Sequence, residues 1–243
     1  MRSTRPVVPP PRASSGDILA IGKVPNPFGP EDTPVRREIV EAVNRMGGIG
    51  EDAEARYQHA LKALRGHSKD VLIEVAALYD RLPAHRYLDR WSLVQLVTSL
   101  EDPASLTFLD EILSSALPPE ESKKPATYST VGQEVIIRTT AIEAVDRLAA
   151  GGDTQALEVL LKHTRHHNFS VKRAAIQSYL AQGGKHARQA LLKALPVKDH
   201  HILDIRRADV HEVPQPKVEA RSGRDPNELP PRSTLGKREH RSR

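Results

Sequence analysis

A helical pattern that recurs at fixed distances along the chain limits its possible folds more than any other feature. Apolar residues three and four positions apart line one face of each predicted helix. A shift of 48 residues superimposes one such set and its surroundings on a second copy: Arg90 on Arg138, Val94 on Ile142, Val97 on Val145, Leu100 on Leu148, Leu109 on Leu157, Ile112 on Leu160 and Leu113 on Leu161. Such a period indicates copies of one structural unit that stack on each other.

Shifts of 34 residues extend the repeat in both directions. One shift aligns Arg138 with Lys172, and another aligns Arg56 with Arg90. The two periods differ by 14 residues, and the polar stretch PPEESKKPATYST accounts for this difference. We therefore predict an inserted loop over residues 118–130.

The repeat predicts an all-α body in which a cap helix over 33–46 precedes four two-helix units. The predicted units are 51–82, 85–116, 133–166 and 169–195. Two helix starts carry local signals, because Pro103 follows Asp102 as in a first helical turn and Asp153 is a predicted N-cap.

Two stretches show the features of one repeat most clearly. VKRAAIQSYLAQGGKHARQALLKAL (171–195) opens with a basic residue and a small apolar pair, and continues with a Gly-rich turn and an Ala/Leu-rich second helix. IIRTTAIEAVDRLAAGGDTQALEVLL (136–161) follows the same order. Both resemble the short bacterial HEAT repeats of the PBS-lyase-like type. The resemblance implies an α-solenoid of stacked two-helix repeats over 31–213.

The two ends of the chain differ from its middle in composition and charge. Residues 1–30 and 214–243 are rich in Pro and Arg and poor in apolar residues, which predicts disordered tails. The chain has a net charge of +5, but residues 31–182 carry 18 basic and 22 acidic residues. An acidic body argues against a groove that follows nucleic-acid phosphates. Between body and tail, HILDIRRADVHEV predicts an extended cap over 201–213.

A basic residue recurs at the same place in each unit: Arg56, Arg90, Arg138 and Lys172. In HEAT proteins, residues at this place bridge neighbouring units or cap the facing helix. The resemblance therefore implies a structural ladder, and a row of anion sites is the alternative.

No residue pattern predicts catalysis or a cofactor. The absence of cysteine excludes disulfides and thiol chemistry, and no nucleotide-binding Gly loop, nucleophile elbow or zincin motif occurs. His163 and His167 are four residues apart, but no carboxylate or thiol at a suitable spacing completes a ligand set, so we predict no metal site. The HEAT resemblance leaves two enzyme classes as alternatives, which are bilin lyases and metal-dependent hydroxylases.

Binding another protein or peptide is the function that an extended solenoid surface suits best. If the leucines at 157, 160 and 161 face the core, the residues on the opposite side of that helix project outward. The same register in each second helix predicts a mildly acidic partner-binding surface formed by Asp80, Asp110, Glu158 and Lys162. We therefore predict a non-enzymatic interaction scaffold, with nucleic-acid binding through the basic tails as the alternative.

The sequence shows neither a secretory signal pattern nor an apolar stretch long enough to span a membrane. We therefore expect a cytoplasmic protein.

Overall fold

The computed structural model describes residues 26, 28–30, 32–125 and 129–205, and in this part of the chain all regular structure is helical. The chain divides into two compact units, Met1–Asp204 and Ile205–Arg243, and Ile205 is the only described residue of the second. The α-helices of the first unit are α1 (Pro34–Met46), α2 (Ala53–Arg65), α3 (Ser68–Arg81), α4 (Tyr87–Leu100), α5 (Leu106–Ser114), α6 (Thr130–Ala150), α7 (Thr154–His163), α8 (Phe169–Gln182) and α9 (Ala187–Ala194). Short 3-10 helices cover Pro103–Ser105, Gly184–His186 and Val197–Asp204. The prediction of an all-α fold is confirmed.

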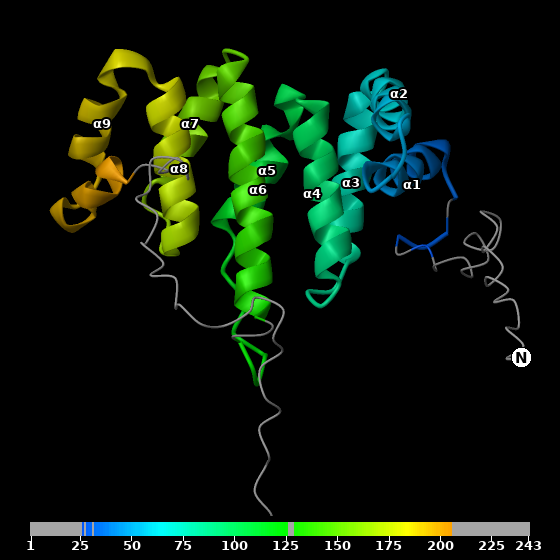
Figure 1. Cartoon of the computed structure of the whole chain (residues 1–243), viewed down its shortest axis with the longest axis horizontal. Helices are drawn as coiled ribbons and strands as arrows, with labels where there is room; N and C mark the ends of the chain where they lie inside the picture. The colour runs from blue at the N-terminus through cyan, green and yellow to red at the C-terminus, as the bar shows by residue number, and fades with distance from the viewer. Residues whose placement is uncertain (1–25, 27, 31, 126–128, 206–243) are drawn as a thin grey trace, which may run out of the picture. The chain divides into compact units, whose positions relative to one another are not determined.

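Helices close in sequence pack beside one another (Figure 1). α4, α6 and α8 lie in one row, in which α6 contacts both α4 and α8. α5 and α7 each pack against α6 and also contact each other. Towards the N-terminus, α1 contacts α2, α3 and α4.

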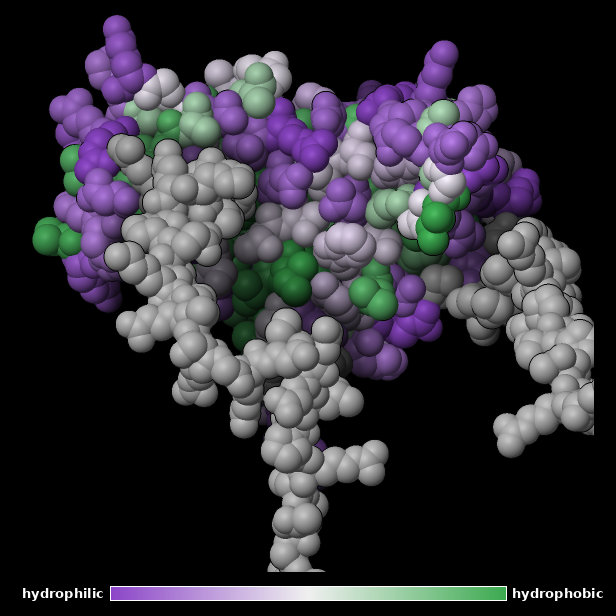
Figure 2. All heavy atoms as spheres, in the orientation of Figure 1, coloured by the Kyte–Doolittle hydropathy of each residue, from purple (hydrophilic) through white to green (hydrophobic). Residues whose placement is uncertain are grey.

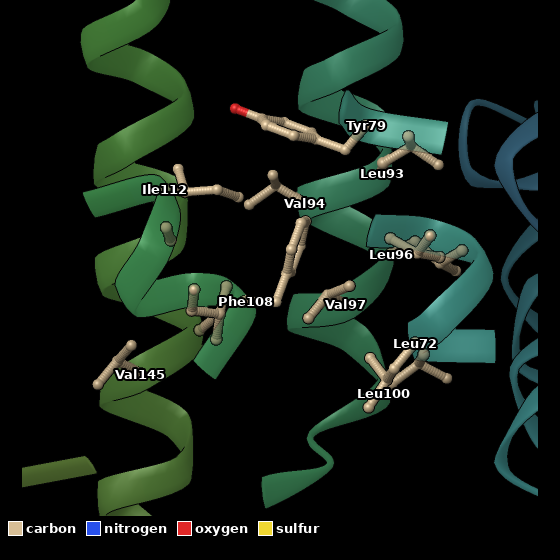
Figure 3. Packing of buried hydrophobic residues seen from close by; sticks show 14 of the residues in the cluster. Leu72, Tyr79, Leu93, Val94, Leu96, Val97, Leu100, Phe108, Ile112 and Val145 are labelled. Atoms are coloured by element: carbon tan, nitrogen blue, oxygen red, sulfur yellow. The ribbon is translucent and has the colours of Figure 1, made fainter. Parts of the chain in front are cut away.

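Apolar side chains from neighbouring helices form the core through these contacts (Figure 3). Leu93 and Leu96 of α4 and Leu109 of α5 are fully buried. Phe108 of α5 meets the ring of Tyr79 on α3 edge to face, with the ring centroids 5.5 Å apart. Because short helices are marginal in isolation, this burial between helices is what stabilises them.

The two helix starts that the sequence signals are confirmed. The carboxylate of Asp153 accepts hydrogen bonds from the backbone N–H groups of Gln155 and Ala156, so Asp153 is the N-cap of α7. Asp102 caps the 3-10 helix in which Pro103 is the first residue.

The observed helices fall within the predicted ranges with one difference in the inserted loop. Each of the predicted units 51–82, 85–116 and 169–195 contains two helices, and α1 lies within the predicted cap helix. The third pair starts at Thr130 rather than 133, so α6 extends into the range predicted as loop. The reason is a cap, because the Ser129 hydroxyl accepts a hydrogen bond from the N–H of Gly132 at 2.8 Å.

The prediction of an extended cap over 201–213 is wrong for residues 201–204, which belong to the 3-10 helix Val197–Asp204. Ile202 and Leu203 are both buried in this helix, which packs against α8 and α9. An extended chain would direct two adjacent side chains to opposite faces, whereas a helical turn can bury both. Residues 206–213 lie outside the described part of the chain.

The predicted N-terminal tail also begins to pack earlier than expected. Phe28 is 6% exposed and belongs to the apolar core. The side chain of Asn26 accepts from the N–H of Phe28 and donates to the carbonyl of Gly29, which fixes a local turn. The rest of the predicted tails, residues 1–25 and 214–243, lies outside the described residues.

Candidate functional site

The four predicted partner-binding residues occupy different environments. Asp80 on α3 and Glu158 on α7 are exposed, and among the described residues neither carboxylate has a hydrogen bond or ion pair. Asp110 on α5 and Lys162 on α7 pair with each other instead, with Nζ 2.6 Å from Oδ2. Two of the three predicted carboxylates are therefore available to a partner.

The Asp110–Lys162 pair belongs to a polar cluster that links α5 to α7. Lys162 Nζ also donates to the hydroxyl of Ser114 at 3.0 Å, and Oδ1 of Asp110 lies 2.6 Å from Nε2 of His163. Partial burial raises the pKa of Asp110, but the contacts with Lys162 and His163 outweigh it and hold the pKa below its usual value. Asp110 is thus an anionic link between two helices.

The buried side of α7 is rotated relative to the predicted one. Leu160 is fully buried as expected, whereas Leu157 and Leu161 are half-buried. Ala156 and His163 occupy the inward positions. A histidine is tolerated there because its ring has a hydrogen-bond partner in the Asp110 carboxylate.

Three of the four bases predicted for the ladder contact another helical element, and Arg56 does not. Arg56 pairs with Asp52, the residue just before its own helix α2, at 2.6 Å and remains exposed. Lys172 on α8 pairs with Asp199 at 2.7 Å and so fastens the 3-10 helix Val197–Asp204 to α8.

Arg90 and Arg138 meet at one buried carboxylate, that of Glu134 on α6. Arg90 Nη1 lies 2.7 Å from Oε2 of Glu134, and Arg138 Nη1 lies 3.0 Å from Oε1. Arg90 Nη2 also donates to the hydroxyl of Tyr79 at 2.7 Å. Burial raises the pKa of Tyr79 to about 12 despite the nearby arginine. The network joins α3, α4 and α6.

Arg138 also satisfies the C-terminal end of α5. Its Nη2 donates to the backbone carbonyls of Ser115 and Ala116, each at 3.1 Å. These carbonyls follow the last turn of the helix, where acceptors lack partners within the helix itself. Burial lowers the pKa of Arg138, and the contact with Glu134 opposes this effect.

Glu134 is the residue of this network that sequence reasoning missed. It lies four positions before Arg138, and that spacing on one helix was the available signal.

Beside this network, two adjoining cavities open between the α3–α4 turn and the loop before α6. Their volumes are about 350 and 200 Å³, and they share Ala84, Pro118 and Glu134. We call them together the loop hollow. Its other lining includes Tyr79, Asp80, Leu82, Arg90, Tyr87 and Glu121. One predicted partner-binding residue, Asp80, and one predicted ladder residue, Arg90, thus lie in one hollow.

The loop that borders the hollow is fastened to the start of α6. The Glu120 carboxylate accepts hydrogen bonds from the Ser129 hydroxyl at 2.5 Å and from the backbone N–H of Ser122 and Thr130. These hydrogen bonds, that of Ser129 foremost, lower the pKa of Glu120 to about 2. The neighbouring Glu121 carboxylate has no such partner among the described residues.

His163 and His167, the two histidines four residues apart, have different partners. His163 contacts Asp110, while His167 stacks on His166 with ring centroids 4.3 Å apart. Burial, reinforced by His167, lowers the pKa of His166 to about 4. Among the described residues, no three acidic, histidine or cysteine side chains lie close enough together to hold a metal ion.

Within the described ranges, no helix is both long and apolar enough to cross a membrane. The chain matches no protein-family model, no curated protein and no solved structure.

Proposed function

We propose that the body of this protein is an α-solenoid of HEAT-like repeats. The support is the agreement between the sequence period and the helix pairs: α4–α5 and α8–α9 each lie in one predicted unit, and α6–α7 matches the unit 133–166 except that α6 starts at Thr130. The contacts of α6 with both α4 and α8 fit the stacking of first helices in such a solenoid. Arg138, which reaches from α6 to the end of α5, fits the bridging role that the HEAT resemblance implies.

We further propose that the protein is a non-enzymatic scaffold that binds a protein or peptide partner. One observation carries this proposal, which is that the inserted loop borders a hollow containing Asp80. In repeat proteins, insertions into a repeat often form loops on the binding face. The loop therefore adds specific contacts to a surface that repeats alone would leave uniform.

The charges of the loop hollow favour a basic side chain of the partner. The carboxylates of Asp80 and Glu121 have no partner among the described residues. Arg90 and Arg138 together carry one more positive charge than Glu134 balances, and the two unpaired carboxylates outweigh that charge. Leu82 and Tyr87 supply apolar and aromatic surface against which the stem of a lysine or arginine can pack.

The second part of the predicted surface, on α5 and α7, takes a different role in this proposal. Glu158 offers an unpaired carboxylate to the same partner, whereas Asp110 and Lys162 hold the two helices together. The alternative of nucleic-acid binding depends on residues 1–30 and 214–243, most of which lie outside the described residues. The enzyme alternatives have no observation in their favour.

Selection of peptides from a random phage-displayed library tests the proposal. We expect selected peptides to contain a basic residue and to bind the Asp80→Lys variant at least tenfold more weakly than the original protein. Asp70→Lys is the matched control, because Asp70 is an exposed aspartate of the same helix outside the hollow. Peptides that bind both variants equally well would contradict the assignment of the loop hollow.

A further inference from the structure

The N-terminal end of the described chain lies beside the loop hollow. The core residue Phe28 lines a cavity of about 370 Å³ against the end of α3 and the α3–α4 turn. This cavity shares Leu82 with one part of the loop hollow and His85 with the other. The residues that come before Phe28 in the sequence therefore join the body next to the hollow.

Local contacts fix the chain at this point. Phe28 is buried in the core, and Nη1 of Arg36 donates to the carbonyl of Pro30 at 3.0 Å. The side chain of Asn26 bonds to the backbone of Phe28 and Gly29. A segment attached to a fixed point by a short tether has a high effective concentration, on the order of millimolar, at neighbouring sites.

The tether is long enough for the first basic residue before Asn26 to reach Asp80. An α-helix with its side chains is about 10–12 Å across, so the path around the end of α3 from the Phe28 cavity to the hollow is of this order. Lys23 lies three positions before Asn26, and three residues span up to about 10 Å. The long side chain of Lys23 extends this reach.

The charges of the N-terminal segment and of the hollow are complementary. Residues 1–25 contain four basic residues and one acidic residue. Asp80 and Glu121 line the two parts of the hollow, and neither carboxylate has a partner among the described residues. Lys23 is the basic residue of this segment that is nearest to them along the chain.

An apolar run precedes Lys23 and matches the apolar lining of the hollow. Residues 18–21 read Ile-Leu-Ala-Ile, the longest uninterrupted apolar run within residues 1–25. Leu82 and Tyr87 are half-buried in the hollow and offer apolar surface to such a run. Figure 2 shows green and purple residues side by side over the ends of α3 and α4 that meet at this turn.

We propose that residues 18–23 occupy the loop hollow of their own chain, with Nζ of Lys23 between the carboxylates of Asp80 and Glu121. The inference rests on the proposed function, because it uses the same preference of the hollow for a basic side chain. It adds regulation to that site, since a partner must displace the chain's own segment. A surface ion pair alone is weak, and the short tether to Asn26 compensates for this weakness.

Carbodiimide cross-linking of the full chain at low micromolar concentration, read by peptide mass spectrometry, tests the contact without any partner. The reagent joins a lysine amine directly to a carboxylate that it touches. We expect a link from Lys23 to Asp80 or Glu121. Lys23 should form no link to Asp70, which lies ten residues, about 15 Å, before Asp80 on the same helix.

The Lys162–Asp110 pair, with Nζ 2.6 Å from Oδ2, is the positive control for the reaction. An equal mixture of ¹⁵N-labelled and unlabelled protein separates links within one chain from links between two chains. A digest that contains the Lys162–Asp110 link but no link from Lys23 to either carboxylate of the hollow would overturn the inference. Lys23 links found only between chains would overturn it as well.

A competition experiment tests the regulation. Lys23→Gln should lower the Kd of a library-selected basic peptide about two- to fivefold, because the peptide no longer displaces the segment. Arg5→Gln is the matched control, since it removes the same charge farther from the hollow along the chain, and it should leave the Kd unchanged. An equal Kd for Lys23→Gln and the original protein would refute the competition.

The two proposals for the hollow fail in different ways. Because the cross-link forms without a partner, its absence overturns this inference even where peptides bind the hollow. Peptides that bind the Asp80→Lys variant undiminished contradict the proposed function even where the link forms.

Discussion

Replacing Glu134 by glutamine removes the carboxylate that contacts both Arg90 and Arg138 while keeping the size of the side chain. The side chain of Glu134 is 7% exposed, and those of Arg138 and Arg90 are 1% and 13% exposed, so water solvates the remaining charges only poorly. Removal of one member of a buried ion pair typically costs about 3–5 kcal/mol. We expect a loss of this size in the free energy of unfolding.

Thermal unfolding followed by circular dichroism measures the loss. For a folded region of this size, about 1 kcal/mol corresponds to 2–4 °C, so Tm should fall by about 6–20 °C. Glu143→Gln is the control, because Glu143 pairs with Arg147 on the exposed side of the same helix and its loss should cost less than about 1 kcal/mol. If Glu134→Gln were no more destabilising than Glu143→Gln, the network would not hold α3, α4 and α6 together as argued.

Three further predictions concern the core, the histidines and the last helical segment. Leu160→Ala should lower the free energy of unfolding by about 2–5 kcal/mol and Leu157→Ala by clearly less, because only Leu160 of the two is fully buried. Equal losses, measured by urea unfolding, would refute the observed register of α7. His166 has a pKa of about 4 in the folded protein and about 6.5 in the unfolded chain, so the folded protein binds this proton more weakly. The free energy of unfolding should therefore be highest above about pH 6.5 and should fall as the pH drops towards 4. His166→Gln should reduce the change of the urea midpoint with pH. An unchanged dependence on pH would show that His166 is not its source. Lys172→Met should speed amide hydrogen exchange in residues 197–204 but not in α6, since it frees Asp199; unchanged exchange would show that the pair does not fasten this segment.

The sequence period located the helices well because packing between helices requires apolar residues at regular positions. Arg90 and Arg138, 48 residues apart, do contact the same carboxylate. The period could not distinguish these two from Arg56, because a repeat of bases does not show which partner each base contacts. Arg56 has Asp52 four residues away and remains a local pair.

Sequence reasoning was least successful where a contact between residues far apart in the sequence determines the environment of a side chain. Asp110 resembles any other surface carboxylate in the sequence, but Lys162, about fifty residues later, forms an ion pair with it, and Nε2 of His163 lies 2.6 Å from its Oδ1. The loop hollow has the same origin, since Asp80 lies in the first predicted two-helix unit and Pro118 in the predicted inserted loop. Periodicity predicts which side of a helix is buried, but not which neighbours close a hollow over it.

A charge-swap titration tests whether a basic side chain of the partner lies next to Asp80 in the loop hollow, as we propose. The ligand is the tightest-binding lysine-containing peptide from the library selection. A second peptide carries glutamate in place of the key lysine. Calorimetry measures the Kd of each peptide for the original protein and for the Asp80→Lys variant. We predict that each single reversal weakens binding at least tenfold and that the double reversal restores the Kd to within a few fold of the original. A double reversal that binds no better than the single ones would contradict the account.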